Sequence, residues 1–111
     1  MGLFKKKNIE DSVSFRRKMA EKIANYKLRF AVERVDGQDI VISKQGVMLI
    51  RDGVFTVISG VEHGSKTLFR CNVDEMKASE LLSLEGAIVE GPDLENGGKV
   101  RKLVLYYVYY A

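Results

Sequence analysis

The stretch 28–59, LRFAVERVDGQDIVISKQGVMLIRDGVFTVIS, decides the fold class of this chain. Its apolar residues alternate with polar ones or form short β-branched runs, a pattern that is typical of strands. Two Asp-Gly pairs, Asp36-Gly37 and Asp52-Gly53, separate these runs. Asp-Gly supplies the residue types that tight hairpin turns prefer. The stretch therefore predicts an antiparallel meander of consecutive hairpins.

An amphipathic helix is predicted before this meander, from about Ser12 to Tyr26. Phe15, Met19, Ile23 and Tyr26 recur at intervals of four, four and three, which places them on one helical face. Most charged residues of the segment fall on the opposite face. Ser12 is positioned to accept hydrogen bonds from the free backbone N–H groups of the first turn. The apolar face is expected to pack on the sheet.

The remainder of the chain predicts further strands and one short helix. Glycine and polar residues break it into segments with different patterns. We expect strands at 66–73, 87–90 and 100–110, a short helix at 74–83 capped by Asp74 and ended before Gly86, and a flexible polar loop at 91–98. The predicted fold is α+β: an N-terminal amphipathic helix packed on a curved antiparallel sheet or partial β-barrel of about six to seven strands.

The length and composition limit the chain to one folded domain. It has 111 residues, 46% of them hydrophobic and 30% charged, which suffices for one core but not for two. We expect a flexible basic arm at residues 1–10 and a single α+β domain at 11–111. The single cysteine and the lack of an apolar segment of signal-peptide or membrane-spanning length favour a reducing, cytoplasmic location.

Positive charge is concentrated at the start of the chain. Residues 1–30 carry nine bases and three acids, whereas the other 81 residues carry nine bases and twelve acids. Such an asymmetry can orient an anionic partner toward one end of a protein. The candidate anion contacts are Lys5, Lys6, Lys7, Arg16 and Arg17, and the partner would be a nucleic acid or an anionic membrane surface. The alternative is a solubilising N-terminal tail followed by a solvated helix face.

The final predicted strand is apolar on both faces. Leu103, Leu105, Tyr107 and Tyr109 fall on one face, and Val104, Tyr106, Val108 and Tyr110 fall on the other. Such a strand needs cover on both sides, from a second layer of strands, a second copy of the chain or a ligand. Tyrosine suits an interface because it joins a large apolar ring to a hydroxyl group. Tyr106, Tyr107, Tyr109 and Tyr110 are therefore the candidate interface of a homo-oligomer, expected to be a dimer.

The sequence offers little for catalysis, and we predict no catalytic, cofactor or metal site. The single histidine, His63, lies in a predicted turn, and Cys71 shares a strand face with apolar residues, as a small buried hydrophobe would. A catalytic role would require Glu85, Glu90 or Asp93 to converge with His63 on one pocket. No Cys-x-x-Cys motif, histidine pair or phosphate-binding glycine loop occurs.

Two functions follow as hypotheses. The first is a non-catalytic interaction or scaffold domain that self-associates through its C-terminal tyrosine-rich strand and can also bind a protein partner. The second is a module that binds nucleic acid or an anionic surface through its basic N-terminal helix.

Overall fold

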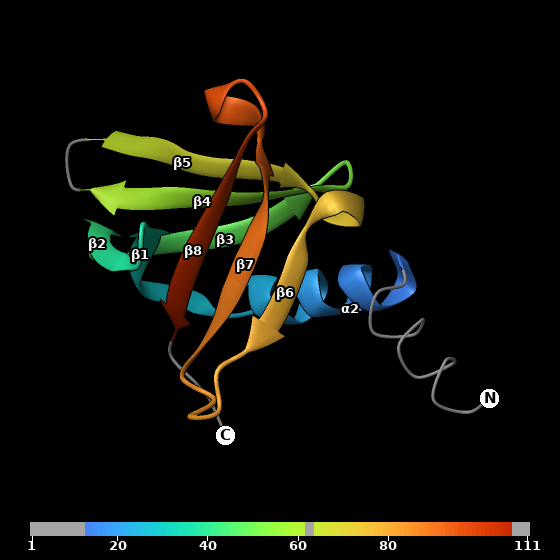
Figure 1. Cartoon of the computed structure of the whole chain (residues 1–111), viewed down its shortest axis with the longest axis horizontal. Coiled ribbons are helices and arrows are strands. Elements are labelled where there is room, and N and C mark those ends of the chain that lie inside the picture. The colour runs from blue at the N-terminus through green and yellow to red at the C-terminus, as the bar shows by residue number, and fades with distance from the viewer. Residues whose placement is uncertain (1–12, 62–63, 108–111) are drawn as a thin grey trace.

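A computed structural model describes residues 13–61 and 64–107 and has an α+β fold (Figure 1). The described residues form one α-helix, α2 (Val13–Ala24), and eight strands. The strands are β1 (Lys27–Val35), β2 (Gln38–Ser43), β3 (Gly46–Arg51), β4 (Val54–Val61), β5 (Gly64–Asn72), β6 (Lys77–Glu80), β7 (Gly86–Asp93) and β8 (Lys99–Tyr107). Two short 3-10 helices, η1 (Val73–Glu75) and η2 (Leu94–Asn96), follow β5 and β7. The predicted α+β class is confirmed.

All eight strands belong to one antiparallel sheet. Its order is β5-β4-β3-β1-β8-β7-β6, and β2 pairs with β1 beside this path. Both Asp-Gly pairs form the predicted hairpin turns. Asp36-Gly37 has φ angles of 51° and 77°, and Asp52-Gly53 has φ angles of 52° and 75°. Two successive positive φ angles define the type I′ turn, whose twist matches that of paired strands.

The sheet is strongly curved but is not closed into a barrel. In Figure 1, β7 and β8 cross in front of β4 and β5, so that the sheet folds into two layers. The long strand β1 joins the layers because it pairs with β3 near Lys27 and with β8 from Leu28 to Glu33. The two edge strands β5 and β6 have no pairing with each other among the described residues.

The main core fills the space between the two layers and beneath the helix. Ala20 and Ile23 of α2 are fully buried, and the helix packs against η1, β3 and β6. The helix is confirmed within two residues of its predicted ends, and it is not long and apolar enough to cross a membrane. The other buried members of the core are Leu28, Ala31, Met48, Phe55, Val57, Phe69, Cys71, Val73, Met76, Ala87, Val89, Leu103, Leu105 and Tyr107.

The short helix predicted at 74–83 is wrong. The chain makes the single 3-10 turn η1 and then the strand β6, which pairs with β7 from Lys77 to Glu80. Met76 is buried and Ala78 packs on the core, so residues two apart share a face as in a strand. The predicted loop at 91–98 is shorter than expected, because residues 91–93 continue β7 opposite Arg101, Val100 and Lys99. Long-range pairing outweighs the local helix and loop preferences in both segments.

Candidate interaction surfaces

The first two arginines of the basic helix are bound to η1. The Arg17 guanidinium donates to both carboxylate oxygens of Asp74, at 2.8 and 3.0 Å, and Arg16 Nη1 donates to the backbone carbonyl of Asp74 at 2.8 Å. The hydrogen bond from Arg17 lowers the pKa of the Asp74 carboxyl, and the positive charges of Arg17 and Arg16 lower it further. These contacts tie α2 to η1, the turn that precedes β6.

The predicted anion contacts are thus unequal. Arg17 already forms an ion pair with a carboxylate, and so does Lys22, which binds Glu80 of β6. Arg16 keeps its charge without a carboxylate partner among the described residues. Lys5, Lys6 and Lys7 lie outside the described residues. Binding of nucleic acid or an anionic membrane surface stays a prediction, with less free charge on the helix than the sequence suggests.

Tyr107 is a core residue. Its side chain is 1% exposed, and its ring stacks on Tyr26 with the centroids 4.4 Å apart and an angle of 4° between the planes. Tyr107 therefore offers no surface to a partner, which corrects its assignment to the predicted interface. The other two residues of that group beyond β8, Tyr109 and Tyr110, lie outside the described residues.

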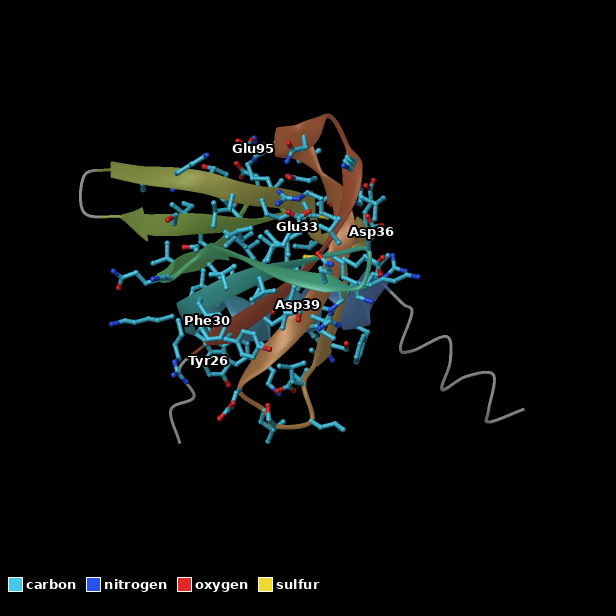
Figure 2. The ribbon with its side chains drawn as sticks, turned by 60° about the vertical axis from the view of Figure 1, so that its left-hand side comes forward. Tyr26, Phe30, Glu33, Asp36, Asp39 and Glu95 are labelled. Atoms are coloured by element: carbon cyan, nitrogen blue, oxygen red, sulfur yellow. The ribbon has the colours of Figure 1, made fainter. Side chains whose placement is uncertain are left out.

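Tyr106 lies on the opposite face of β8, directed away from the main core. It pairs with Phe30 of β1, and the two rings stack with their centroids 4.3 Å apart. Both side chains are only partly buried. Figure 2 shows the β1–β2 hairpin in front, with Phe30 near one end of the strand pair and Asp36 at its turn. Of the predicted tyrosine interface, Tyr106 is the described residue that has exposed surface.

A row of aliphatic side chains continues from this aromatic pair. The strand register places Val41 of β2 beside Val32 of β1, Val32 beside Val104 of β8, and Val104 beside Ile88 of β7. Val32 and Val104 are buried but do not belong to the main core, whereas Val41 is 56% exposed. We call Val41, Val32, Val104, Ile88, Phe30 and Tyr106 the outer patch.

A network of charged side chains lies at the other end of the same strands. Asp93 is fully buried, and its carboxylate accepts hydrogen bonds from the backbone N–H groups of Arg70 and Glu95, at 3.0 and 2.9 Å. It also accepts from the Asn96 side chain and, at 2.7 Å, from Arg101 Nη1. Every donor satisfies a charge that would otherwise be costly to bury.

Arg101 connects this carboxylate to a second one. Its guanidinium also donates to both oxygens of Glu33 and to the backbone carbonyl of Leu68 in β5. The hydrogen bond from Arg101 lowers the pKa of Glu33. Burial alone would raise the pKa of Asp93, but the hydrogen bonds outweigh it and the pKa is lowered. The network joins β1, β7 and β8 to β5, and its groups are occupied with one another, as in a structural site.

Sequence reasoning missed this network. Glu33 and Arg101 lie in separate strands, where their side chains follow the same alternation as ordinary surface residues, and Leu68 contributes only its backbone carbonyl. From the sequence, Asp93 is a candidate catalytic partner for His63, which lies outside the described residues. The one local signal is Asp93 before Glu95-Asn96, a spacing at which an aspartate can cap a following turn.

Cys71 is a fully buried free thiol, as predicted. Burial raises its pKa to about 12, and the nearby negative charges of Glu75 and Asp93 act in the same direction. A thiol in this state is a poor nucleophile at neutral pH.

Among the described residues, no group of three or more His, Cys, Asp or Glu side chains is arranged to hold a metal ion.

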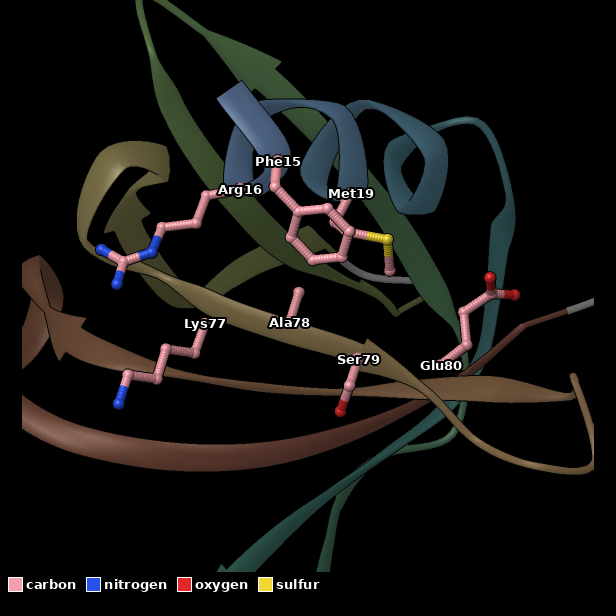
Figure 3. A pocket seen from close by; sticks show the side chains of 7 residues that line it. All are labelled: Phe15, Arg16, Met19, Lys77, Ala78, Ser79 and Glu80. Carbon is pink, nitrogen blue, oxygen red and sulfur yellow. The ribbon is translucent and has the colours of Figure 1, made fainter. Parts of the chain in front are cut away.

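An open groove lies between α2 and β6 (Figure 3). Its cavity volume is about 570 Å³, and its walls are Phe15, Arg16, Met19, Lys77, Ala78, Ser79 and Glu80. In Figure 3, Phe15 and Met19 point from the helix toward the strand, while Arg16 and Lys77 lie at one end and Glu80 at the other. The sequence could not predict this groove, because it assigned residues 77–80 to a helix.

Comparison of the chain with protein-family models, with curated proteins and with solved structures finds no match. The function must therefore be argued from the side chains described above.

Proposed function

We propose that this chain is a non-catalytic protein-interaction domain that forms a dimer through the outer patch. The observation that carries the proposal is the partly exposed apolar surface on the outer face of β1, β2, β7 and β8, which is formed by Val41, Ile88, Phe30 and Tyr106 above the buried pair Val32 and Val104. Contiguous apolar side chains on an outer sheet face are characteristic of interaction sites. The adjoining stack of Phe30 and Tyr106 adds aromatic area, which interfaces favour.

A second copy is the partner that fits this patch best. A two-fold interface uses the same surface on both subunits, so one apolar patch suffices for a closed dimer. At its rim, Arg34 pairs with Asp39 at 2.9 and 3.2 Å, so the neighbouring charges balance. A balanced rim does not repel an identical surface.

We also propose a reducing, cytoplasmic compartment, in keeping with the buried free thiol of Cys71.

The test is the solution mass of the full-length chain, measured by light scattering at near-physiological salt. We expect a dimer. Val41→Asp introduces a charge at an exposed position of the patch and should give a folded monomer, as judged by circular dichroism. The matched control is Leu94→Asp in η2, because Leu94 is 46% exposed and lies outside the patch. This variant should remain dimeric. A monomeric parent chain, or a Val41→Asp variant that still dimerises, would refute the proposal.

A further inference from the structure

The groove between α2 and β6 is bordered by a free strand edge. β6 pairs with β7 on one side and has no strand neighbour on the other among the described residues. A free edge presents backbone N–H and C=O groups that a further strand can bind. Extended peptides use such edges in several kinds of recognition domain.

The register of β6 identifies which backbone groups face the free edge. Leu81 N–H donates to the Gly86 carbonyl, so residues 81 and 86 form a hydrogen-bonded pair. In an antiparallel ladder, hydrogen-bonded and non-hydrogen-bonded pairs alternate along the strand. The pairs Ala78 with Val89 and Glu80 with Ala87 are therefore of the second type. The backbone N–H and C=O groups of Ala78 and Glu80 consequently point away from β7.

The walls of the groove add apolar contact beside this edge. Phe15 and Met19 project from α2 toward Ala78 (Figure 3), and all three side chains are only partly buried. Their arrangement offers an apolar site for one side chain on the helix side of an added strand. The volume of about 570 Å³ lies within the usual range of ligand-binding clefts.

The charges of the groove are arranged by sign along β6. Arg16 and Lys77 lie at the N-terminal end of the strand, on opposite sides of it (Figure 3), and neither has a carboxylate partner among the described residues. Glu80 occupies the C-terminal end, where Lys22 pairs with it. An occupant is therefore favoured if it carries an acidic group at the Lys77 end and none at the Glu80 end.

We propose that this groove binds an extended peptide segment of a partner protein, which adds to β6 as an antiparallel strand. An apolar side chain opposite Ala78 packs on Phe15 and Met19. The next residue of the peptide lies opposite Lys77, on the face of the sheet that points away from α2, and is acidic, so that its carboxylate pairs with Lys77. This binding site is separate from the outer patch and does not depend on self-association.

The probe that tests the proposal is the capped hexapeptide Thr-Lys-Thr-Ile-Asp-Thr. In the antiparallel register its lysine lies opposite Glu80, its isoleucine opposite Ala78 and its aspartate opposite Lys77. Titration into the isotopically labelled full-length chain, followed by NMR, should shift the backbone signals of 77–80 and of the helix residues around Met19. A peptide that produces no shifts, or shifts only elsewhere, would overturn the proposal.

Two altered peptides separate strand addition from nonspecific attraction. Exchanging aspartate for lysine replaces an attractive cross-strand charge pair with a repulsive one and should raise the Kd by about tenfold. N-methylation of the isoleucine amide removes the N–H that would donate to the Ala78 carbonyl and should abolish the shifts. Equal binding of all three peptides would contradict addition to the β6 edge.

Protein variants complete the test and separate it from the dimer proposal. Lys77→Glu should weaken binding of the parent peptide, whereas Lys66→Glu, an exposed lysine of β5 outside the groove, should not. Val41→Asp should bind the peptide normally, because its substitution lies in the outer patch. If rising protein concentration displaced the peptide from Val41→Asp, the occupant would be a second copy of the chain, and the partner-protein proposal would fail.

Discussion

The Arg101 guanidinium in β8 donates to both carboxylate oxygens of Glu33 in β1, at 2.9 and 2.7 Å, and at the same time reaches the fully buried Asp93 of β7. One positive charge is thus shared by two carboxylates from the strands on either side of β8. Its third contact, with the Leu68 carbonyl in β5, crosses to the other layer of the sheet. Arg101 therefore links four strands at the end of the sheet opposite the Tyr26–Tyr107 stack.

Removing this guanidinium should strongly destabilise the fold. Arg101→Met leaves Asp93 charged and buried without its cation, and loss of one partner of a buried ion pair costs about 3–5 kcal/mol. The free energy of unfolding is measured by urea denaturation. Arg34→Met, which breaks the exposed pair with Asp39, is the control and should change stability far less. Equal effects of the two substitutions would show that the network contributes no more than a surface pair.

The same network predicts loss of stability in acid. The pKa values of Asp93 and Glu33 are lowered in the folded chain, so both groups bind protons more readily when the chain is unfolded. Their contribution is complete above their ordinary pKa values, and it is lost as the pH falls from about 4 toward the lowered values.

A substitution should reduce this acid sensitivity. Glu33→Gln removes one titrating group, so the free energy of unfolding should fall less steeply between about pH 5 and pH 2 than in the parent chain. Glu85→Gln, at an exposed position outside the network, should keep the slope of the parent. Both are followed by urea denaturation at a series of pH values. An unchanged slope for Glu33→Gln would contradict the lowered pKa.

Local patterns determine how much of this fold the sequence could predict. The helix and both Asp-Gly hairpins were predicted because their signals lie within a few residues of one another. β6 was mistaken for a helix because Asp74 and Gly86 resemble helix caps, while the pairing with β7 that decides the segment is not local. The groove and the charged network were beyond prediction for the same reason. Arg16 meets Asp74, and Arg101 meets Glu33, across 58 and 68 residues of chain.

The two adjacent tyrosines of β8 should respond differently to truncation. Tyr107 is buried in the core against Tyr26, so Tyr107→Ala should cost about 3–5 kcal/mol of unfolding free energy, as for other large aromatic core residues. Tyr106→Ala should cost less, since Tyr106 is partly exposed, and it should weaken the proposed dimer. Urea denaturation and light scattering measure the two effects. A larger stability loss for Tyr106→Ala would reverse the assignment of core and surface faces.

The Cys71 thiol should be unreactive in the folded chain. Its pKa of about 12 lies well above neutral pH, so very little of the reactive thiolate is present, and the side chain is fully buried. Modification by a disulfide reagent at pH 8 should be slow without denaturant and rapid in concentrated urea. Fast modification of the folded chain would mean that β5 opens readily from β7.

Close packing of Cys71 against Gly91 gives the last prediction. A Cβ atom added at Gly91 would lie 2.6 Å from Cys71 Sγ and 3.2 Å from the Glu75 carbonyl oxygen, both closer than normal contact. Gly91→Ala should therefore destabilise the chain by about 1–3 kcal/mol, the usual cost of overpacking a core. Cys71→Ala removes the sulfur atom, so the double variant should be more stable than the sum of the single effects predicts. Urea denaturation of the four chains measures this coupling. The backbone carbonyl of Glu75 cannot be truncated, so Cys71→Ala should restore only part of the stability that Gly91→Ala removes. Strictly additive effects would instead mean that the strands separate to admit the extra methyl group.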